Sequence, residues 1–335
     1  MTENPTRDAI IQVNSNFHTI AGKSVVDRAD ARYREYRKKW EEWPVHFSIG
    51  DFPLHLDIEP TNTCNLRCPF CATTHNKYNK GFMPEAVWKK ILDEAGPNGL
   101  YSLKFTYRGE PLLHRDLPEM VRYAKEAGVM DVYFNTNAVK LDEPMIRALI
   151  DAGLDRISIS FEGNTPEVYE KYRVGAEFSR VVKNIETLRA IKKELGVEKP
   201  LVRIQTVLVP ELRGKEKEYA DFWSTRADEV AYLDMKDEEG NPDHRGIVDN
   251  WACPQIFQRM TITWDGTILP CVHDIYEWMS LGKIGRTTLR EAWNSEAAQH
   301  YRHLHKTGKA HEIKACDRCP LRENEITKIR KGTQS

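Results

Sequence analysis

Three cysteines fall within eight consecutive positions of the chain: Cys64, Cys68 and Cys71, in the stretch CNLRCPFC. A C-x3-C-x2-C spacing on one loop can fold three thiolates around one face of a four-iron cluster. Zinc is the alternative, but it needs a fourth ligand because tetrahedral zinc closes its coordination shell, and the nearest candidate is His75. With three protein ligands, the fourth iron of a cluster stays open to another ligand, which suits catalysis.

A second set of four cysteines lies far downstream: Cys253, Cys271, Cys316 and Cys319. Four thiolates can complete either a [4Fe–4S] cluster or a structural zinc site, and the residues alone leave both open. Three plus four accounts for all 7 cysteines of the chain. No thiol is then left to donate a hydrogen atom to a substrate radical.

The composition sets limits on the class of protein. The 335 residues suffice for one large domain and a smaller one. A formal net charge of −1 gives no nucleic-acid footprint, and no apolar run is long enough to cross a membrane. The N-terminus lacks the basic-then-apolar order of a signal peptide. We therefore expect a cytoplasmic protein with no nucleic-acid or membrane partner, where reduced thiols favour metal ligation over disulfides.

Strand-like and helix-like segments alternate from residue 54 onward. The strand-like runs are residues 54–60, 102–107, 131–137, 156–161, 201–209 and 229–235. Helical periodicity is found between them at residues 85–94, 117–127, 144–152, 178–195 and 215–224. This order predicts repeated βα units that curl a parallel sheet into an open or closed barrel.

Polar motifs follow several of these strands directly. The cysteine loop follows the first strand, RGEP the second and FEG the fourth, while NTN ends the third. In a parallel barrel, functional residues gather at the carboxyl ends of the strands, so this placement predicts one shared site.

The flanking segments have a different character. A charged helix is predicted within residues 25–43, and its charges indicate a solvated face. A polar linker, KDEEGNPDHRG, occupies residues 236–246, and RMTITWDGTILPC predicts a hairpin that turns at Asp265–Gly266. A long helical pattern follows, in which we expect His300, His303 and His305 to be surface or packing residues rather than ligands.

Several motifs in the same order identify a resemblance to a known family. The chain resembles the radical S-adenosylmethionine (radical SAM) superfamily in four segments: CNLRCPFC, YRGEPLLHRDL, SISFEGNTPEVYEKYR and VVKNIETLRA. In the second of these, Arg108 stands in place of the first glycine of the superfamily's Gly-Gly-Glu-Pro region. WDGTILPC and LGKIGRTTLREAWNS resemble its SPASM/twitch extension. The resemblance covers residues 54 to 320, and the order of the four later cysteines is similar to that of butirosin-type aminocyclitol dehydrogenases.

The resemblance implies an α/β fold with three parts. Residues 51–236 would form the radical SAM core, a partial (βα)6 TIM-like barrel, after a partly helical N-terminal extension at residues 1–50. Residues 237–335 would form a small SPASM/twitch domain built from a β-hairpin and a helix.

The resemblance also implies the cofactors. Cys64, Cys68 and Cys71 would hold a [4Fe–4S] cluster whose open iron chelates the amino and carboxylate groups of SAM. An electron from a reductant such as flavodoxin or ferredoxin would then cleave SAM to methionine and a 5′-deoxyadenosyl radical, which removes a hydrogen atom from substrate. The four later cysteines would hold an auxiliary [4Fe–4S] cluster.

Residues at the strand ends match the family's SAM contacts. A backbone oxygen of Gly109 and the carboxylate of Glu110 would accept hydrogen bonds from the SAM ammonium. Ser160 and Arg173 would bind the SAM carboxylate, because the planar guanidinium fork suits that group.

The remaining predicted contacts are to the ribose and the adenine. Asn135 and Asn137 would contact the ribose, although asparagine also forms turns for purely structural reasons. Phe70 and Leu208, with Val207, would flank the adenine, although apolar residues at such positions commonly belong to the core.

The leading prediction for the reaction is a dehydrogenation. An auxiliary cluster can accept the second electron of a two-electron oxidation, whereas an epimerase needs a hydrogen donor. The N-terminal ~50 residues are too few for a separate leader-binding domain, which favours a small polar substrate such as a sugar or aminocyclitol. Epimerisation and peptide modification remain alternatives, and a redox-sensing iron–sulfur binding module is a more distant one. The sequence identifies no catalytic base.

Overall fold

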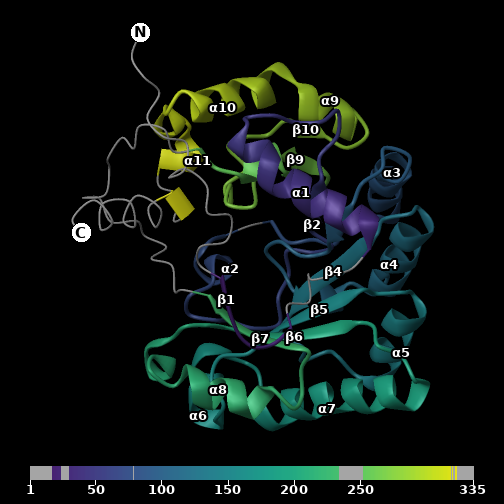
Figure 1. Cartoon of the computed structure of the whole chain (residues 1–335), viewed down its shortest axis with the longest axis vertical. Coiled ribbons are helices and arrows are strands. Elements are labelled where there is room, and N and C mark those ends of the chain that lie inside the picture. Colours follow the sequence, from purple (N-terminus) through teal and green to yellow (C-terminus); the bar gives the residue numbers. More distant parts are fainter. Residues whose placement is uncertain are drawn as a thin grey trace.

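The computed structural model describes residues 17–23, 30–77, 79–233, 252–317, 319 and 321–322. The predicted linker at residues 236–246 lies outside these residues, so the domain limits stay predictions. Figure 1 shows an α/β molecule with one continuous sheet and helices on its outer side.

The predicted parallel sheet is confirmed. Its six strands are β2 (His55–Ile58), β3 (Ser102–Lys104), β4 (Asp131–Thr136), β5 (Arg156–Ser160), β6 (Leu201–Val207) and β7 (Glu229–Leu233). Each pairs in parallel with the next, in sequence order. The carboxyl ends of all six strands therefore lie at the same edge of the sheet, as the grouping of motifs requires.

The two outer strands of this set pair with further strands and not with each other. β1 (Phe17–Gly22) runs antiparallel to β7, and β8 (Arg259–Ile262) runs parallel to β2. The full order is β1-β7-β6-β5-β4-β3-β2-β8-β9-β10. The described sheet is thus an open, TIM-like partial barrel extended at both edges, as predicted for the core.

Helices with one apolar stripe cover the outer face of the sheet (Figure 1). They are α3 (Glu85–Ala95), α4 (Leu117–Glu126), α5 (Glu143–Asp151), α6 (Pro166–Tyr172), α7 (Phe178–Leu195) and α8 (Glu216–Trp223). In α3, Trp88, Ile91, Leu92 and Ala95 recur at helical spacing and are almost completely buried. All five predicted helices are present, and α6 is an additional one.

The charged N-terminal helix is confirmed as α1 (Ala31–Val45). Asp30 caps it by accepting a hydrogen bond from the Tyr33 amide at 2.8 Å. Its charges are solvated, but Tyr36 and Trp40 are buried and contact Tyr101, just before β3, and His55, the first residue of β2. The helix therefore packs against the amino ends of the strands, opposite the predicted site.

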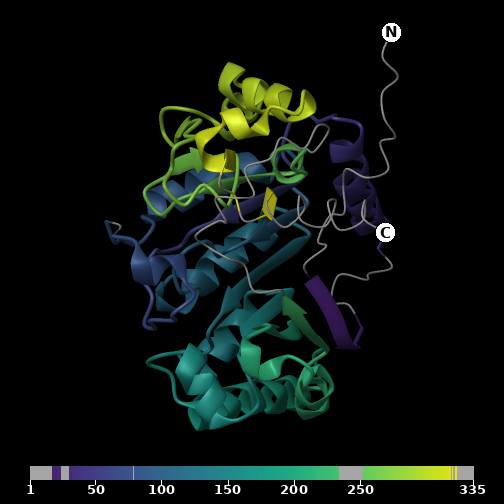
Figure 2. The ribbon, with the colours of Figure 1, turned by 90° about the vertical axis from the view of Figure 1, so that its left-hand side faces the viewer.

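The C-terminal elements gather at one end of the barrel (top of Figures 1 and 2). They are β8, β9 (Thr267–Leu269), β10 (Gly282–Lys283), α9 (Leu289–Asn294), α10 (Glu296–Lys306) and α11 (Lys314–Asp317). β8 and β9 form the predicted hairpin, and Gly266 has φ +87°, which favours glycine at this turn. Leu289 and Trp293 of α9 belong to the same apolar core as the barrel.

Candidate active site

The first three cysteines lie on the loop between β2 and the short helix α2 (Ala72–His75). None of them forms a disulfide; Cys68 is buried, and Cys64 and Cys71 are half-buried. The Leu66 amide donates to Cys64 Sγ at 3.4 Å, and Thr73 Oγ1 lies 2.9 Å from Cys71 Sγ. Hydrogen bonds of this kind to sulfur are typical around iron–sulfur clusters.

The thiols of this loop are electrostatically costly to ionise on their own. Burial raises the pKa of Cys68 to about 11, partly offset by the cationic Arg173, while Glu162 and the neighbouring thiols raise it further. Burial also raises the pKa of Cys64. A cationic partner that binds all three sulfurs would remove this cost, since metal ligation keeps thiols deprotonated.

The local contacts fit an iron–sulfur cluster better than Cys3His zinc. His75 Nε2 lies 2.5 Å from the backbone oxygen of Pro69, so its ring is engaged there. Among the residues described, no group of three or more His, Cys, Asp or Glu converges as ligands of one metal ion. In a four-iron cluster each cysteine binds a separate iron, so its sulfurs need not converge on one point.

Arg173, a predicted SAM contact, lies beside this loop. Its guanidinium forms a buried ion pair with both carboxylate oxygens of Glu162, with Nη2 at 2.7 Å from Oε1. Its Nη1 lies 3.7 Å from Cys68 Sγ, and its Cζ lies 5.6 Å from the ring centroid of Phe70. Burial opposes the charged form, but Glu162 outweighs it and raises the pKa of Arg173, so the cation is permanent.

Glu110 is buried and its carboxylate accepts three hydrogen bonds. They come from the Leu112 amide at 3.1 Å, Thr136 Oγ1 at 2.6 Å and the Asn137 amide at 2.8 Å. Burial raises the pKa of Glu110 and these donors oppose the shift. The carboxylate thus links the turn after β3 to the end of β4 while keeping lone pairs for a further donor.

Gly109 allows this turn to approach the cysteine loop. A Cβ on residue 109 would lie 2.0 Å from the backbone oxygen of Thr61, and the Glu110 amide donates to the Thr63 oxygen at 2.9 Å. Only a residue without a side chain fits so close to another backbone.

Asn137 contacts the cysteine loop directly. Its Nδ2 lies 3.0 Å from Asn65 Oδ1 and 3.9 Å from Cys64 Sγ, and its Oδ1 accepts from the Val139 amide at 3.0 Å. The last contact is a turn-forming hydrogen bond of the kind that competes with a ribose role. The Asn135 backbone pairs with Thr106 Oγ1, and its side chain is half-buried.

The remaining predicted contacts lie at nearby strand ends. Ser160 ends β5 and Leu208 follows β6, and both are half-buried. The Phe70 ring lies 6.1 Å from that of Tyr172. The structure therefore brings Cys68, Phe70 and Arg173 together, and Cys64, Glu110 and Asn137 together.

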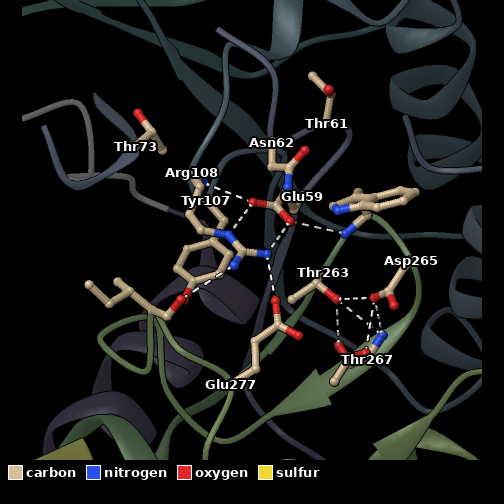
Figure 3. Close-up of polar contacts among 12 residues, drawn as sticks. Glu59, Thr61, Asn62, Thr73, Tyr107, Arg108, Thr263, Asp265, Thr267 and Glu277 are labelled. Atoms are coloured by element: carbon tan, nitrogen blue, oxygen red, sulfur yellow. Dashed lines mark hydrogen bonds and ion pairs between the residues drawn. The ribbon is translucent and has the colours of Figure 1, made fainter. Parts of the chain in front are cut away.

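Three residues that hold the site were missing from the predicted set. Glu162 holds Arg173, Thr136 braces Glu110, and Glu59 pairs with Arg108 (Figure 3). Glu162 and Thr136 belong to the FEG and NTN motifs at strand ends, so a search for buried polar residues in those motifs would have found them.

The four later cysteines also gather, from segments far apart in the chain. Burial raises the pKa of Cys253 to about 12, with the nearby Cys319 adding to the shift. Burial likewise raises the pKa of Cys271 and of Cys316; nearby Cys253 and Cys319 add to the shift of Cys271, and the other three cysteines add to that of Cys316. Three of these cysteines are buried and Cys316 is half-buried, so ionising all four together is costly unless a bound metal stabilises the thiolates.

His305 of α10 lies within this set as a buried packing residue. Its Nδ1 accepts a hydrogen bond from the Cys253 amide at 3.1 Å, and its Nε2 lies 3.6 Å from Cys316 Sγ. Because Nδ1 is the acceptor, the neutral ring carries its proton on Nε2, which faces the sulfur. Burial lowers the pKa of His305 to about 4, in keeping with that neutral form.

Comparison with known proteins identifies both parts of the chain. Residues 58–222 match the radical SAM superfamily, and residues 253–320 match SPASM, an iron–sulfur cluster-binding domain. The chain therefore belongs to the radical SAM superfamily. Within it, the chain is of the type that carries a C-terminal SPASM domain, so its cofactors are SAM and iron–sulfur clusters in both domains.

Curated relatives match at two scales. The PqqA peptide cyclase of Granulibacter bethesdensis is 34% identical over 144 residues, which are 42% of this chain and 37% of that protein. The tungsten-containing aldehyde ferredoxin oxidoreductase cofactor-modifying protein of Pyrococcus furiosus is 24% identical over 80% of this chain and 88% of its own. The chain thus spans less than half the length of the peptide cyclase that it matches at higher identity.

Solved structures share the fold. BtrN in complex with AdoMet and 2-DOIA is 20% identical with a TM-score of 0.51, over 80% of this chain and 91% of that one. Native anSMEcpe with bound AdoMet and Kp18Cys peptide is 18% identical with a TM-score of 0.59, over 80% of this chain and 88% of that one.

Among the helices that the structure describes, none has the length and apolar character that a membrane-spanning segment needs.

Proposed function

We propose that this protein uses SAM to remove two hydrogens from a small polar substrate, such as a sugar or an aminocyclitol. The observation that carries this proposal is the division of all seven cysteines into an incomplete set of three and a complete set of four. The incomplete set leaves room for SAM, and the complete set can take up an electron.

When bound, SAM and the first cluster supply a 5′-deoxyadenosyl radical that abstracts hydrogen from substrate. The protein's own residues bind and orient. Gly109 and Glu110 would receive the SAM ammonium, and Ser160 and Arg173 its carboxylate. For Arg173 this role is supported by its charge and by its place 3.7 Å from Cys68 Sγ.

The other assigned contacts complete the SAM site in this proposal. Asn135 and Asn137 would contact the ribose, with Asn137 already turned toward Asn65 and Cys64. Phe70 and Leu208 would flank the adenine, since both side chains are only half-buried and so have surface left for a ligand.

Oxidation is favoured over epimerisation because no cysteine is spare. The substrate would lose one hydrogen atom to the 5′-deoxyadenosyl radical, and the resulting substrate radical would lose an electron to the auxiliary cluster and a proton to a base. The product is then two hydrogens lighter than the substrate, and the electrons balance once an external acceptor reoxidises the cluster. Epimerisation would instead need a hydrogen-atom donor close to the substrate.

Peptide modification is the second candidate. It is supported by the similarity of 144 residues of this chain to a protein named for cyclising a peptide. That similarity covers 42% of this chain and 37% of that protein, so we rank peptide modification second.

The experiment is an anaerobic assay of the reconstituted protein with dithionite and SAM. Libraries of sugars, aminocyclitols and peptides would be screened for a product two hydrogens lighter that forms together with 5′-deoxyadenosine. A product of unchanged mass that carries deuterium from solvent would contradict oxidation and favour epimerisation. Modification of peptides alone would overturn the substrate class.

A further inference from the structure

Arg108 stands where the family resemblance places a glycine, directly before Gly109. It follows β3 and is only 7% exposed. Figure 3 shows its guanidinium between two carboxylates, those of Glu59 and Glu277. Glu59 follows β2 of the barrel, whereas Glu277 belongs to the auxiliary loop, which we define as residues 271–281. The side chain therefore joins the two domains.

The contact with Glu59 is a two-pronged ion pair. Nε lies 2.9 Å from Oε1 and Nη2 lies 2.9 Å from Oε2, which is the geometry in which guanidinium and carboxylate bind most specifically. Burial opposes the charge, but Glu59 outweighs it and raises the pKa of Arg108. Glu59 Oε2 also accepts from the Trp264 amide at 3.1 Å, so the same carboxylate holds the hairpin turn after β8.

The contact with Glu277 involves an unusual backbone. Arg108 Nη2 lies 2.8 Å from Glu277 Oε1, and Glu277 has φ +61°, a left-handed conformation that glutamate rarely adopts. The surrounding turn enforces it, because the Asp274 carboxylate accepts from the Trp278 amide at 3.0 Å and the Met279 amide at 2.7 Å. Strained residues held in this way cluster at functional sites.

Three further contacts join the auxiliary loop to the barrel, and in one of them Arg108 Nη1 donates to the Ile275 backbone oxygen at 3.4 Å. The Tyr107 hydroxyl donates to the backbone oxygen of Asp274 at 3.0 Å, and the Tyr276 hydroxyl lies 3.2 Å from Asn76 Oδ1. Asn76 ends the helix that follows Cys71, and Tyr107 precedes the turn of Gly109. The loop that starts at Cys271 thus touches the barrel both just after the cysteine loop and just before the turn of Gly109.

We propose that Arg108 is a positioning residue that fixes the auxiliary loop, and with it Cys271, against the turn of Gly109 and Glu110. The part of this proposal that concerns SAM rests on the proposed function, whereas the part that concerns Cys271 stands on the SPASM assignment alone. A buried ion pair is a poor source of stability but a good means of fixing one geometry. Arg108 would therefore set how the auxiliary site faces the SAM site.

The test uses Glu277→Ala, which leaves the buried Arg108–Glu59 pair intact and so protects the fold. Its background is the chain with Cys64, Cys68 and Cys71 replaced by Ala, in which the only iron–sulfur signal would come from the auxiliary site. We expect amide exchange in the auxiliary loop to accelerate about tenfold or more, as for the loss of one charge-assisted hydrogen bond. We also expect the electron paramagnetic resonance spectrum and midpoint potential of the reduced auxiliary cluster to shift.

Arg108→Lys serves as the conservative variant. Lysine keeps the charge but not the fork, so its effect on loop exchange and on the cluster spectrum should fall between wild type and Arg108→Gly. Lys283→Ala is the matched control, because it removes a 2.7 Å ion pair with Asp265 in the same domain, and it should change neither readout.

The outcomes separate the possibilities. Unchanged loop exchange in Glu277→Ala would overturn the contact itself. Faster exchange with an unchanged cluster spectrum would show a merely structural contact and would equally overturn the proposal. Because neither readout needs SAM or substrate, failure of the proposed reaction would leave this test unaffected.

Discussion

The two cysteine sets differ in how the chain builds them. The first comes from a single loop of eight residues and is surrounded by polar side chains that touch its sulfurs, Arg173 and Asn137 among them. The second is assembled from three distant segments and is more deeply buried, with His305 packed against it. A less deeply buried site with polar neighbours can exchange a ligand, whereas a fully ligated, more deeply buried one can store an electron.

The largest expected effect separates the two sets by chemistry. Cys68→Ala removes one of only three protein ligands, so reductive cleavage of SAM should fall to background. Formation of 5′-deoxyadenosine under dithionite measures this. If the variant still formed it, the first set could not be the SAM site.

The reciprocal change tests whether the sets are independent. Cys271→Ala should lower the iron content by about four per chain, the content of one cubane, while SAM cleavage without substrate continues. Iron analysis and the 5′-deoxyadenosine assay together measure it. Loss of SAM cleavage in this variant would show that the two sets cannot be treated separately.

A smaller effect concerns the charge beside the first set. Arg173→Met leaves the buried Glu162 without its partner, which should cost about 3–5 kcal/mol of stability and weaken SAM binding. Adding Glu162→Leu should restore the melting temperature but not SAM affinity, measured by calorimetry. Recovery of both would contradict a role for Arg173 in binding SAM.

The smallest effect is steric. Gly109→Ala places a Cβ against the Thr61 oxygen and should cost about 1–3 kcal/mol as the turn shifts, with slower SAM cleavage. Gly99→Ala is the control, because nothing lies within 4 Å of its added Cβ and its cost is limited to the left-handed backbone. Equal effects in the two variants would argue against close contact at the turn.

Much of the fold was predictable because its strands and helices follow from local patterns of apolar and polar residues. Alternating apolar runs gave six strands and five helices within a few residues of their observed bounds, and the Asp265–Gly266 turn was found from its sequence. β1 was missed because its short run FHTIAG has no strand pattern of its own and is held by pairing with β7.

Candidate site residues could be proposed from the sequence by residue type and motif, but their long-range partners could not. The seven cysteines stood out by residue type, the first three also by their spacing on one loop, and Glu110 by its motif, while their roles stay predictions. The partners of Arg108 did not stand out, because Glu59 and Glu277 lie 49 and 169 positions away in the chain, and only tertiary packing brings them together. The burial of His305 beside Cys316 likewise depends on how α10 packs.

Iron and sulfide counts test the central claim most directly, since the claim is that one chain holds one open and one closed cluster. The protein purified and reconstituted without oxygen should contain about eight irons, one cubane at each set, and the variant lacking Cys64, Cys68 and Cys71 about four. Four or fewer irons in the intact chain, together with bound zinc, would contradict the two-cluster account.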